Sequence, residues 1–178
     1  VDAVVSCLGH DLDLKGIWGA PRRLVTDATK RLTAAIQTAN TSSKKTKFIL
    51  MGSEGVANPN GKDDKRAFGE RLILTILRYS VPPHADNEGA AAHIHSLGTS
   101  PGKLEWTVIR PTDLIDGEPT GKFELLEKPQ GSLFGAGIAT RANVAVDFIL
   151  DDAKFNQYKF QMPVIHDIPA PEKKETEL

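Results

Sequence analysis

Short apolar runs that end in glycine, serine or proline alternate along this chain with segments of helical periodicity. The runs at residues 2–9 (DAVVSCLG), 47–53 (KFILMGS) and 104–111 (LEWTVIRP) are rich in β-branched residues. Such runs are typical of strands buried on both faces of a sheet. Since helical patterns fill the gaps between them, the order predicts βαβ units and a parallel sheet.

The first connection predicts one long helix. Pro21 stands at a favoured first helical position, and Asn40 is a suitable stop. Seven apolar residues between them share one helical face: Leu24, Val25, Ala28, Leu32, Ala35, Ile36 and Ala39.

The second connection predicts two helices. Residues 65–80 carry an apolar helical stripe and are stopped by Pro82 and Pro83, and residues 86–97 follow as a second helix. Asp86 and its neighbours Asn87 and Glu88 begin that second helix, where such side chains favour the N-terminus. Capping is therefore a better interpretation of Asp86 than catalysis.

The last third of the chain is less regular. Residues 121–128 are predicted to be extended, residues 141–152 helical, and residues 158–167 a final strand. We expect one domain over residues 1–168. Residues 169–178 form a charged, proline-rich tail that is predicted to be disordered.

Charge and hydropathy limit the partners. The formal net charge of −1 gives no long-range attraction for nucleic acid or anionic lipid. No apolar run reaches the roughly 18 residues that a membrane span needs. We therefore expect a soluble protein of the cytoplasm or of an organelle, with no nucleic-acid or membrane partner.

The ordered strand ends resemble a known family. The runs SCLGH (6–10), ILMGSEG (49–55) and WTVIRPTDLIDGEPTG (106–121), followed by GIATRANVAVDFIL (137–150), resemble the second half of atypical short-chain dehydrogenases. That group includes NmrA-like proteins and flavin or biliverdin-IXβ reductases. The resemblance covers residues 2–166 and implies a Rossmann-like, doubly wound parallel sheet.

The resemblance also implies an NAD(P) crevice at the carboxyl ends of these strands, with NADP favoured over NAD. The implied cofactor-binding positions are Leu8, Gly9 and His10 near the adenosine ribose and pyrophosphate; Met51, Gly52 and Ser53 near the nicotinamide ribose; and Pro111, Thr112, Asp113 and Leu114 along the nicotinamide. Glycine lets backbone approach a ligand closely, although glycine and serine at strand ends are also ordinary turn residues.

One part of the family pattern is absent. None of the 178 residues forms the glycine-rich turn that cradles a pyrophosphate at a helix N-terminus. In the family this turn lies in a first strand–helix–strand block, which also supplies central strands. Without that block, residues 2–9 would form an unpaired apolar edge. We expect the block as upstream residues or as a companion chain.

A second part of the pattern concerns catalysis. The Tyr-x-x-x-Lys pair of classical short-chain dehydrogenases is missing, because Pro83 and Met162 stand four residues after Tyr79 and Tyr158. The resemblance instead implies an NAD(P)H-dependent reductase that transfers hydride to a small conjugated, quinone-like or flavin-like acceptor. Ser53 is one candidate for assisting this step.

His84 is the other candidate for assisting hydride transfer. Biliverdin-reducing members have histidine at the position of Asp113, so the resemblance does not extend to tetrapyrrole reduction. The alternative function is a non-catalytic NAD(P)-binding redox sensor, or a structural or assembly subunit of a larger complex.

The histidines and tryptophans suggest little further chemistry. His93 and His95 lie two residues apart on a predicted helix and therefore on different faces, so we expect no metal site. Trp106 belongs to a predicted strand and to the core. Trp18, in the glycine-rich segment 15–21, is expected to be exposed, where it would cover the adenine or contact a partner.

Overall fold

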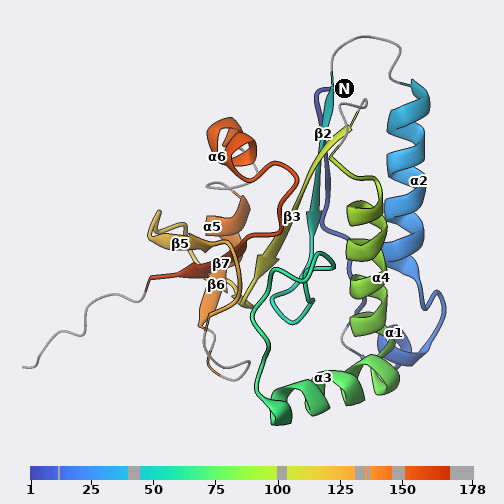
Figure 1. Cartoon of the computed structure of the whole chain (residues 1–178), viewed down its shortest axis with the longest axis vertical. Helices are drawn as coiled ribbons and strands as arrows, with labels where there is room; N and C mark the ends of the chain where they lie inside the picture. Colours follow the sequence, from blue (N-terminus) through green and yellow to red (C-terminus); the bar gives the residue numbers. More distant parts are fainter. Residues whose placement is uncertain are drawn as a thin grey trace, which may run out of the picture.

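The computed structural model describes residues 1–11, 13–39, 45–99, 104–130, 135, 137–145 and 151–168, with the side chains of residues 152–154 left aside. Its centre is a five-stranded sheet with the order β1-β2-β3-β7-β5 (Figure 1). The bounds are β1 (Ala3–Ser6), β2 (Thr46–Met51), β3 (Leu104–Pro111), β7 (Val164–Asp167) and β5 (Phe123–Leu126). The first four strands are parallel, and β5 pairs antiparallel with β7.

Helices cover both faces of this sheet. One face carries α2 (Leu24–Ala39) and α4 (Pro82–Ser96), and the other carries α5 (Arg141–Asn143) and α6 (Asp152–Gln157) (Figure 1). The remaining elements are α1 (Leu14–Trp18), α3 (Phe68–Ser80) and a small parallel pair, β4 (Asp113–Ile115) with β6 (Ile138–Thr140).

The alternation of side chains along β2 explains the two layers. Phe48 and Leu50 pack in the cluster with α2 and α4, whereas Ile49 packs in the cluster with Phe155 and Ile165. Successive strand residues point to opposite faces, so a strand that is apolar throughout needs cover on both sides. The prediction of a doubly wound parallel sheet is therefore confirmed.

The first strand is parallel, as predicted, but it is only partly buried. Among the described residues, β1 pairs only with β2 and forms the edge of the sheet. Ala3 and Val5 are exposed, and Val5 keeps 39 % of its surface. The apolar residues predict a strand, but whether that strand is buried depends on which elements pack against it.

The buried face of α2 differs from the predicted apolar face. Val25 and Ile36 are buried as expected, but the other buried positions are Thr26, Thr29 and Thr33. Threonine fits here because α2 and α4 approach closely: a β-carbon on Gly89 would lie 2.7 Å from Thr26 Oγ1. Of the other residues on the predicted apolar face, Leu24, Ala28 and Leu32 are only partly buried, and Ala35 and Ala39 are exposed.

The other predicted elements are found with shifted ends. The helices predicted at 65–80 and 86–97 correspond to α3 and α4, and α4 begins earlier because Pro82 and Pro83 occupy its first turn. The helix predicted at 141–152 begins at Arg141, but residues 146–150 lie outside the described part. The final strand is only Val164–Asp167, and the predicted tail also lies outside it.

Asp86 joins three elements. Its carboxylate accepts hydrogen bonds from the N–H groups of Val25 (2.7 Å) and Thr26 (2.9 Å) at the start of α2. It also accepts a bond from His10 Nε2 at 2.8 Å, beyond the end of β1. The prediction of capping had the right chemistry but the wrong helix, since Asp86 lies inside α4 and caps α2.

These bonds determine the charge state of Asp86. Burial alone raises the pKa of this carboxyl, but the hydrogen bonds from Thr26, His10 and Val25 outweigh burial and hold the pKa below its usual value. The ionised form is therefore the one that the fold stabilises.

We expect Asp86→Asn to lower the free energy of unfolding by about 3 kcal/mol at pH 7, because the amide cannot accept all these bonds. Since the folded pKa is depressed, the difference is full above the unfolded value of about 3.9 and shrinks as pH falls below it. Urea unfolding between pH 3 and 7 measures this. The control Asp27→Asn, in the exposed pair with Arg23, should cost less than about 1 kcal/mol.

Candidate functional site

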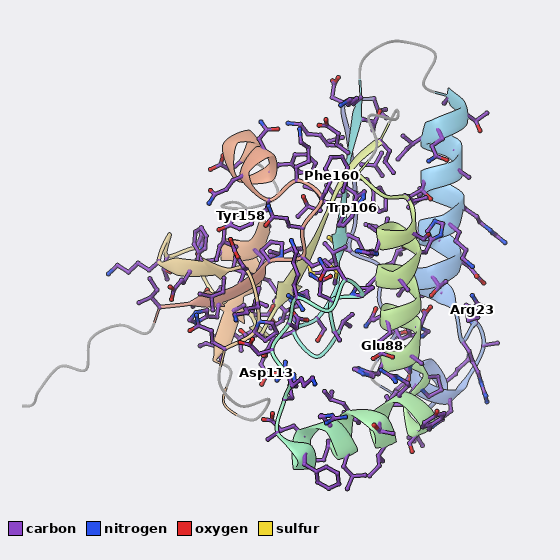
Figure 2. The ribbon with its side chains drawn as sticks, in the orientation of Figure 1. Arg23, Glu88, Trp106, Asp113, Tyr158 and Phe160 are labelled. Atoms are coloured by element: carbon purple, nitrogen blue, oxygen red, sulfur yellow. The ribbon has the colours of Figure 1, made fainter. Side chains whose placement is uncertain are left out.

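The carboxyl ends of β2 and β3 are joined side by side. The N–H of Gly52 donates to the carbonyl of Ile109 at 2.8 Å, and that of Glu54 donates to Pro111 at 3.0 Å. Figure 2 shows Asp113 at this end of β3, with Trp106 near the opposite end. The segments after β2 and β3, which were predicted to border the cofactor, therefore lie side by side.

After β1, the space beside Gly9 is open, whereas the His10 side chain is held inside the protein. A β-carbon on Gly9 would meet nothing within 4 Å, and Leu8 is 45 % exposed. His10 instead points inward, since its Nδ1 lies 3.2 Å from the carbonyl of Gly16 and its Nε2 bonds Asp86. A depression of about 350 Å³, lined in part by Gly9, His10 and Pro21, leaves room for a ligand here.

The end of β2 combines packing with a free hydroxyl. Met51 is half-buried, and a β-carbon on Gly52 would lie 3.2 Å from Val108 Cγ1. The close approach at Gly52 is thus made by β3. Ser53 Oγ accepts only one weak hydrogen bond in the described structure, from the N–H of Gly55 at 3.3 Å. This hydroxyl is able to donate to a ligand.

His84 lies on the other side of the same turn. A β-carbon on Gly55 would be 3.6 Å from His84 Cε1 and 3.8 Å from Ser53 Oγ. The structure therefore brings together the two residues predicted to assist catalysis, although 31 positions separate them in the sequence.

The imidazole of His84 has a lowered pKa and a ring nitrogen that makes no hydrogen bond in the described structure. Its Nε2 is buried and makes no hydrogen bond within the described structure, although Glu88 Oε1 lies 3.5 Å away. Both oxygens of Glu88 already accept from Arg78, at 2.6 and 2.7 Å. Burial lowers the pKa of His84, Glu88 opposes that shift and Arg78 adds to it. The ring is therefore uncharged at neutral pH.

The end of β3 contains a second unbonded group. Pro111 is buried, Asp113 is exposed and Leu114 is half-buried. Thr112 is only 8 % exposed, yet its Oγ1 has no hydrogen-bond partner in the described part of the chain. It lines a small cavity of about 100 Å³ together with Glu54 and His166. A buried hydroxyl without a partner is one that a ligand or water can satisfy.

A buried ion pair, which the sequence pattern did not predict, supports this end of the sheet. Arg110 is fully buried in β3 and binds Asp63 through Nη1 (2.6 Å) and Nη2 (3.0 Å). It also donates to the carbonyls of Met162 and Val56. An arginine inside an apolar strand was the signal that could have revealed it, since a buried charge needs a partner.

A larger open cavity lies beside this pair. Its volume is about 980 Å³, and it is bordered by residues 63–67, the first half of α3 and residues 128–130. Among the described residues, no three His, Cys, Asp or Glu side chains are grouped as metal ligands would be.

The sequence profile of the NAD(P)H-binding family matches residues 1–152. The chain belongs to this family. The family assignment confirms the resemblance to atypical short-chain dehydrogenases and identifies NAD(P)H as the cofactor class. Among curated protein sequences, none matches the chain.

Solved structures show the same fold. The oxidoreductase ylbE from Lactococcus lactis is 19 % identical, with a TM-score of 0.57 over 95 % of this chain and 63 % of its own. The anaerobillin reductase ChuY from Escherichia coli O157:H7 is 18 % identical, with a TM-score of 0.55 over 94 % and 66 %. A short-chain dehydrogenase/reductase from Veillonella parvula, solved with NADP, is 16 % identical, with a TM-score of 0.50 over 86 % and 61 %.

The chain therefore spans about two thirds or less of the length of these three structures. Thr112 Oγ1, after β3, and His84 Nε2, beside the turn after β2, are buried without hydrogen bonds in the described part of the chain. The 178 residues contain no glycine-rich turn for the pyrophosphate.

We expect Asp63→Ala to lower the free energy of unfolding by about 3–5 kcal/mol, because it leaves the Arg110 guanidinium buried without its counter-charge. Asp64→Ala is the matched control, since Asp64 is 72 % exposed in its pair with Lys128 and should contribute less than about 1 kcal/mol. Urea unfolding of both variants measures the difference. Equal effects would contradict this assignment.

Proposed function

We propose that this protein uses NAD(P)H to reduce a small conjugated acceptor of the quinone or flavin type. The observation that carries this proposal is the pair formed by Ser53 and His84 around Gly55, beside the joined ends of β2 and β3. In a Rossmann-like sheet, ligands bind outside the carboxyl ends of the strands. The pair then lies where the reactive end of the cofactor and its acceptor meet.

The roles of the individual positions follow the three strand ends. Leu8 and Gly9, with the backbone of His10, border the adenosine side. Met51, Gly52 and Ser53 border the nicotinamide ribose, and Ser53 Oγ donates a hydrogen bond there. Pro111 and Leu114 pack along the nicotinamide, while Thr112 Oγ1 and the exposed Asp113 supply polar contacts. NADP is favoured over NAD.

Bound NAD(P)H supplies the hydride, and the acceptor also takes up a proton. A quinone that gains one hydride and one proton becomes a hydroquinone. His84 is uncharged at neutral pH because burial lowers its pKa, so it orients the acceptor by an N–H hydrogen bond and does not release a proton. Solvent water supplies the proton.

We expect Ser53→Ala and His84→Gln each to lower kcat for NADPH oxidation by a water-soluble quinone about 10- to 100-fold. His93→Gln is the control, because His93 bonds Thr33 on the α2 side of α4 and its pKa is also lowered, with burial the main cause. Initial rates followed at the NADPH absorbance measure the effect. An equal loss in the control would contradict the assignment.

The direction of the His84 shift predicts the pH profile. The parent should keep a level kcat down to the ordinary histidine value of about 6.5 and lose activity only at lower pH, where the ring becomes charged. His84→Gln should lack this acidic fall. Tight NADPH binding without turnover for any acceptor would favour the redox sensor, and no binding by the natural protein would favour a structural subunit.

We further propose that an upstream block or a companion chain completes the cofactor site by pairing with β1 and supplying the glycine-rich turn. Two observations support this. The outer edge of β1 has no strand partner among the described residues. Next to it, Leu8, Pro21, Leu24 and Leu32 line an apolar groove of about 390 Å³. These side chains include the part of the predicted α2 face that α4 leaves uncovered.

Hydrogen exchange of the natural protein tests this proposal. If a strand covers the edge, the amides of Ala3–Ser6 should exchange as slowly as those of the central β2. Free exchange of alternate β1 amides in the natural protein would contradict it.

A further inference from the structure

The helix α3 presents an apolar stripe to solvent. Phe68, Leu72, Ile76 and Tyr79 follow one another at steps of four, four and three residues, which places them on one side of the helix. Their exposed fractions are 80, 52, 54 and 83 %. No residue of α3 is buried. A contiguous exposed stripe of this kind marks an interaction surface.

The position of α3 makes the stripe accessible. Figure 1 shows α3 lying across one end of the molecule, crosswise to α2 and α4. At its C-terminal end, Trp18 of α1 donates from Nε1 to the carbonyl of Ser80 at 3.0 Å, and this side chain is 46 % exposed. The stripe therefore ends in two amphipathic aromatic residues, Tyr79 and Trp18.

The charges next to the stripe are positive. Arg71 on α3 and Lys65 just before it are exposed, and no ion pair in the described part of the chain involves either. The acids nearby are otherwise engaged: Glu88 binds Arg78, Asp64 binds Lys128, and Glu70 is half-buried on the opposite side of the helix. The surface is thus locally cationic although the chain carries −1 overall.

We propose that the stripe (Phe68, Leu72, Ile76 and Tyr79), with Trp18, docks this protein on the surface of a membrane that contains anionic phospholipid. An apolar helix face with flanking cations lies in the plane of the interface. Tyrosine and tryptophan rings favour the headgroup level, and Arg71 and Lys65 complement the lipid charge.

The geometry agrees with an in-plane arrangement. The 13 residues of α3 extend about 20 Å, which is shorter than the roughly 30 Å hydrocarbon core of a bilayer. In the described part of the chain, no helix combines the length and apolar character needed for a membrane span.

A second copy of the chain is the less favourable occupant. A two-fold interface joins the same patch on both copies. Pairing through this stripe would therefore bring Arg71 and Lys65 toward the same cations of the second copy, and the acids beside them in the described part of the chain are already engaged. Like charges at an interface weaken association, whereas an anionic surface strengthens it.

Vesicle co-sedimentation tests the proposal. The protein should bind vesicles of 70 % phosphatidylcholine and 30 % phosphatidylserine at least ten-fold more tightly than vesicles of phosphatidylcholine alone. Ile76→Glu should reduce binding at least ten-fold, because it removes buried apolar area and adds a repelled charge. Ile168→Glu is the matched control, since Ile168 is 50 % exposed beyond β7, and it should bind as the parent does.

Two further readouts separate the contributions. Arg71→Gln should weaken binding to the anionic vesicles about five-fold and leave the weak binding to phosphatidylcholine unchanged. The emission of the exposed Trp18 should shift to shorter wavelength with vesicles, and Ser53→Ala should not alter this. Equal binding by Ile76→Glu and the parent would overturn the proposal. So would a parent that ignores vesicles but forms a dimer that Ile76→Glu disrupts.

Discussion

The buried pair of Arg110 and Asp63 holds together the end of the molecule on which the proposed chemistry depends. A fully buried guanidinium is stable only if its donors are satisfied, and Arg110 satisfies its donors through Asp63, Val56 and Met162. These partners belong to the long segment after β2 and to the segment before β7. The Arg110 side chain therefore fixes both segments to the middle of the sheet. The turn that carries Ser53 begins next to this fixed region.

The sequence predicted the central strands better than the edge strand, the helix packing and the long-range ion pair around them. The strand at 104–111 was found with both ends correct, because an apolar run bounded by polar residues and closed by a proline has few alternatives. The edge position of β1 depends on neighbours that its own residues do not describe. The buried threonines of α2 depend on the close approach that Gly89 permits. The pairing of Asp63 with Arg110 joins residues 47 apart, which no local pattern reports.

The two apolar surfaces that remain exposed have different meanings. The groove beside β1 continues the sheet and one helix layer, so a further strand and helix of the same fold would suit it. The stripe on α3 faces away from the sheet and has cations at its edge. Periodicity predicted that α3 has an apolar side, but only the packing shows that this side faces outward. The expectation of no membrane partner rested on the net charge and on the lack of a long apolar run, and neither of these describes the face of a single helix.

The capping of α2 by Asp86 has a consequence for synthesis on the ribosome. The carboxylate that satisfies the first N–H groups of α2 lies 61 residues downstream of Val25. While those residues are still being made, α2 has no cap and no α4 to cover its threonines, and an isolated helix of 16 residues is only marginally stable in water. The helix that comes early in the chain therefore becomes stable late. Nascent chains arrested before residue 86 should remain accessible to chaperones over the whole of residues 24–39.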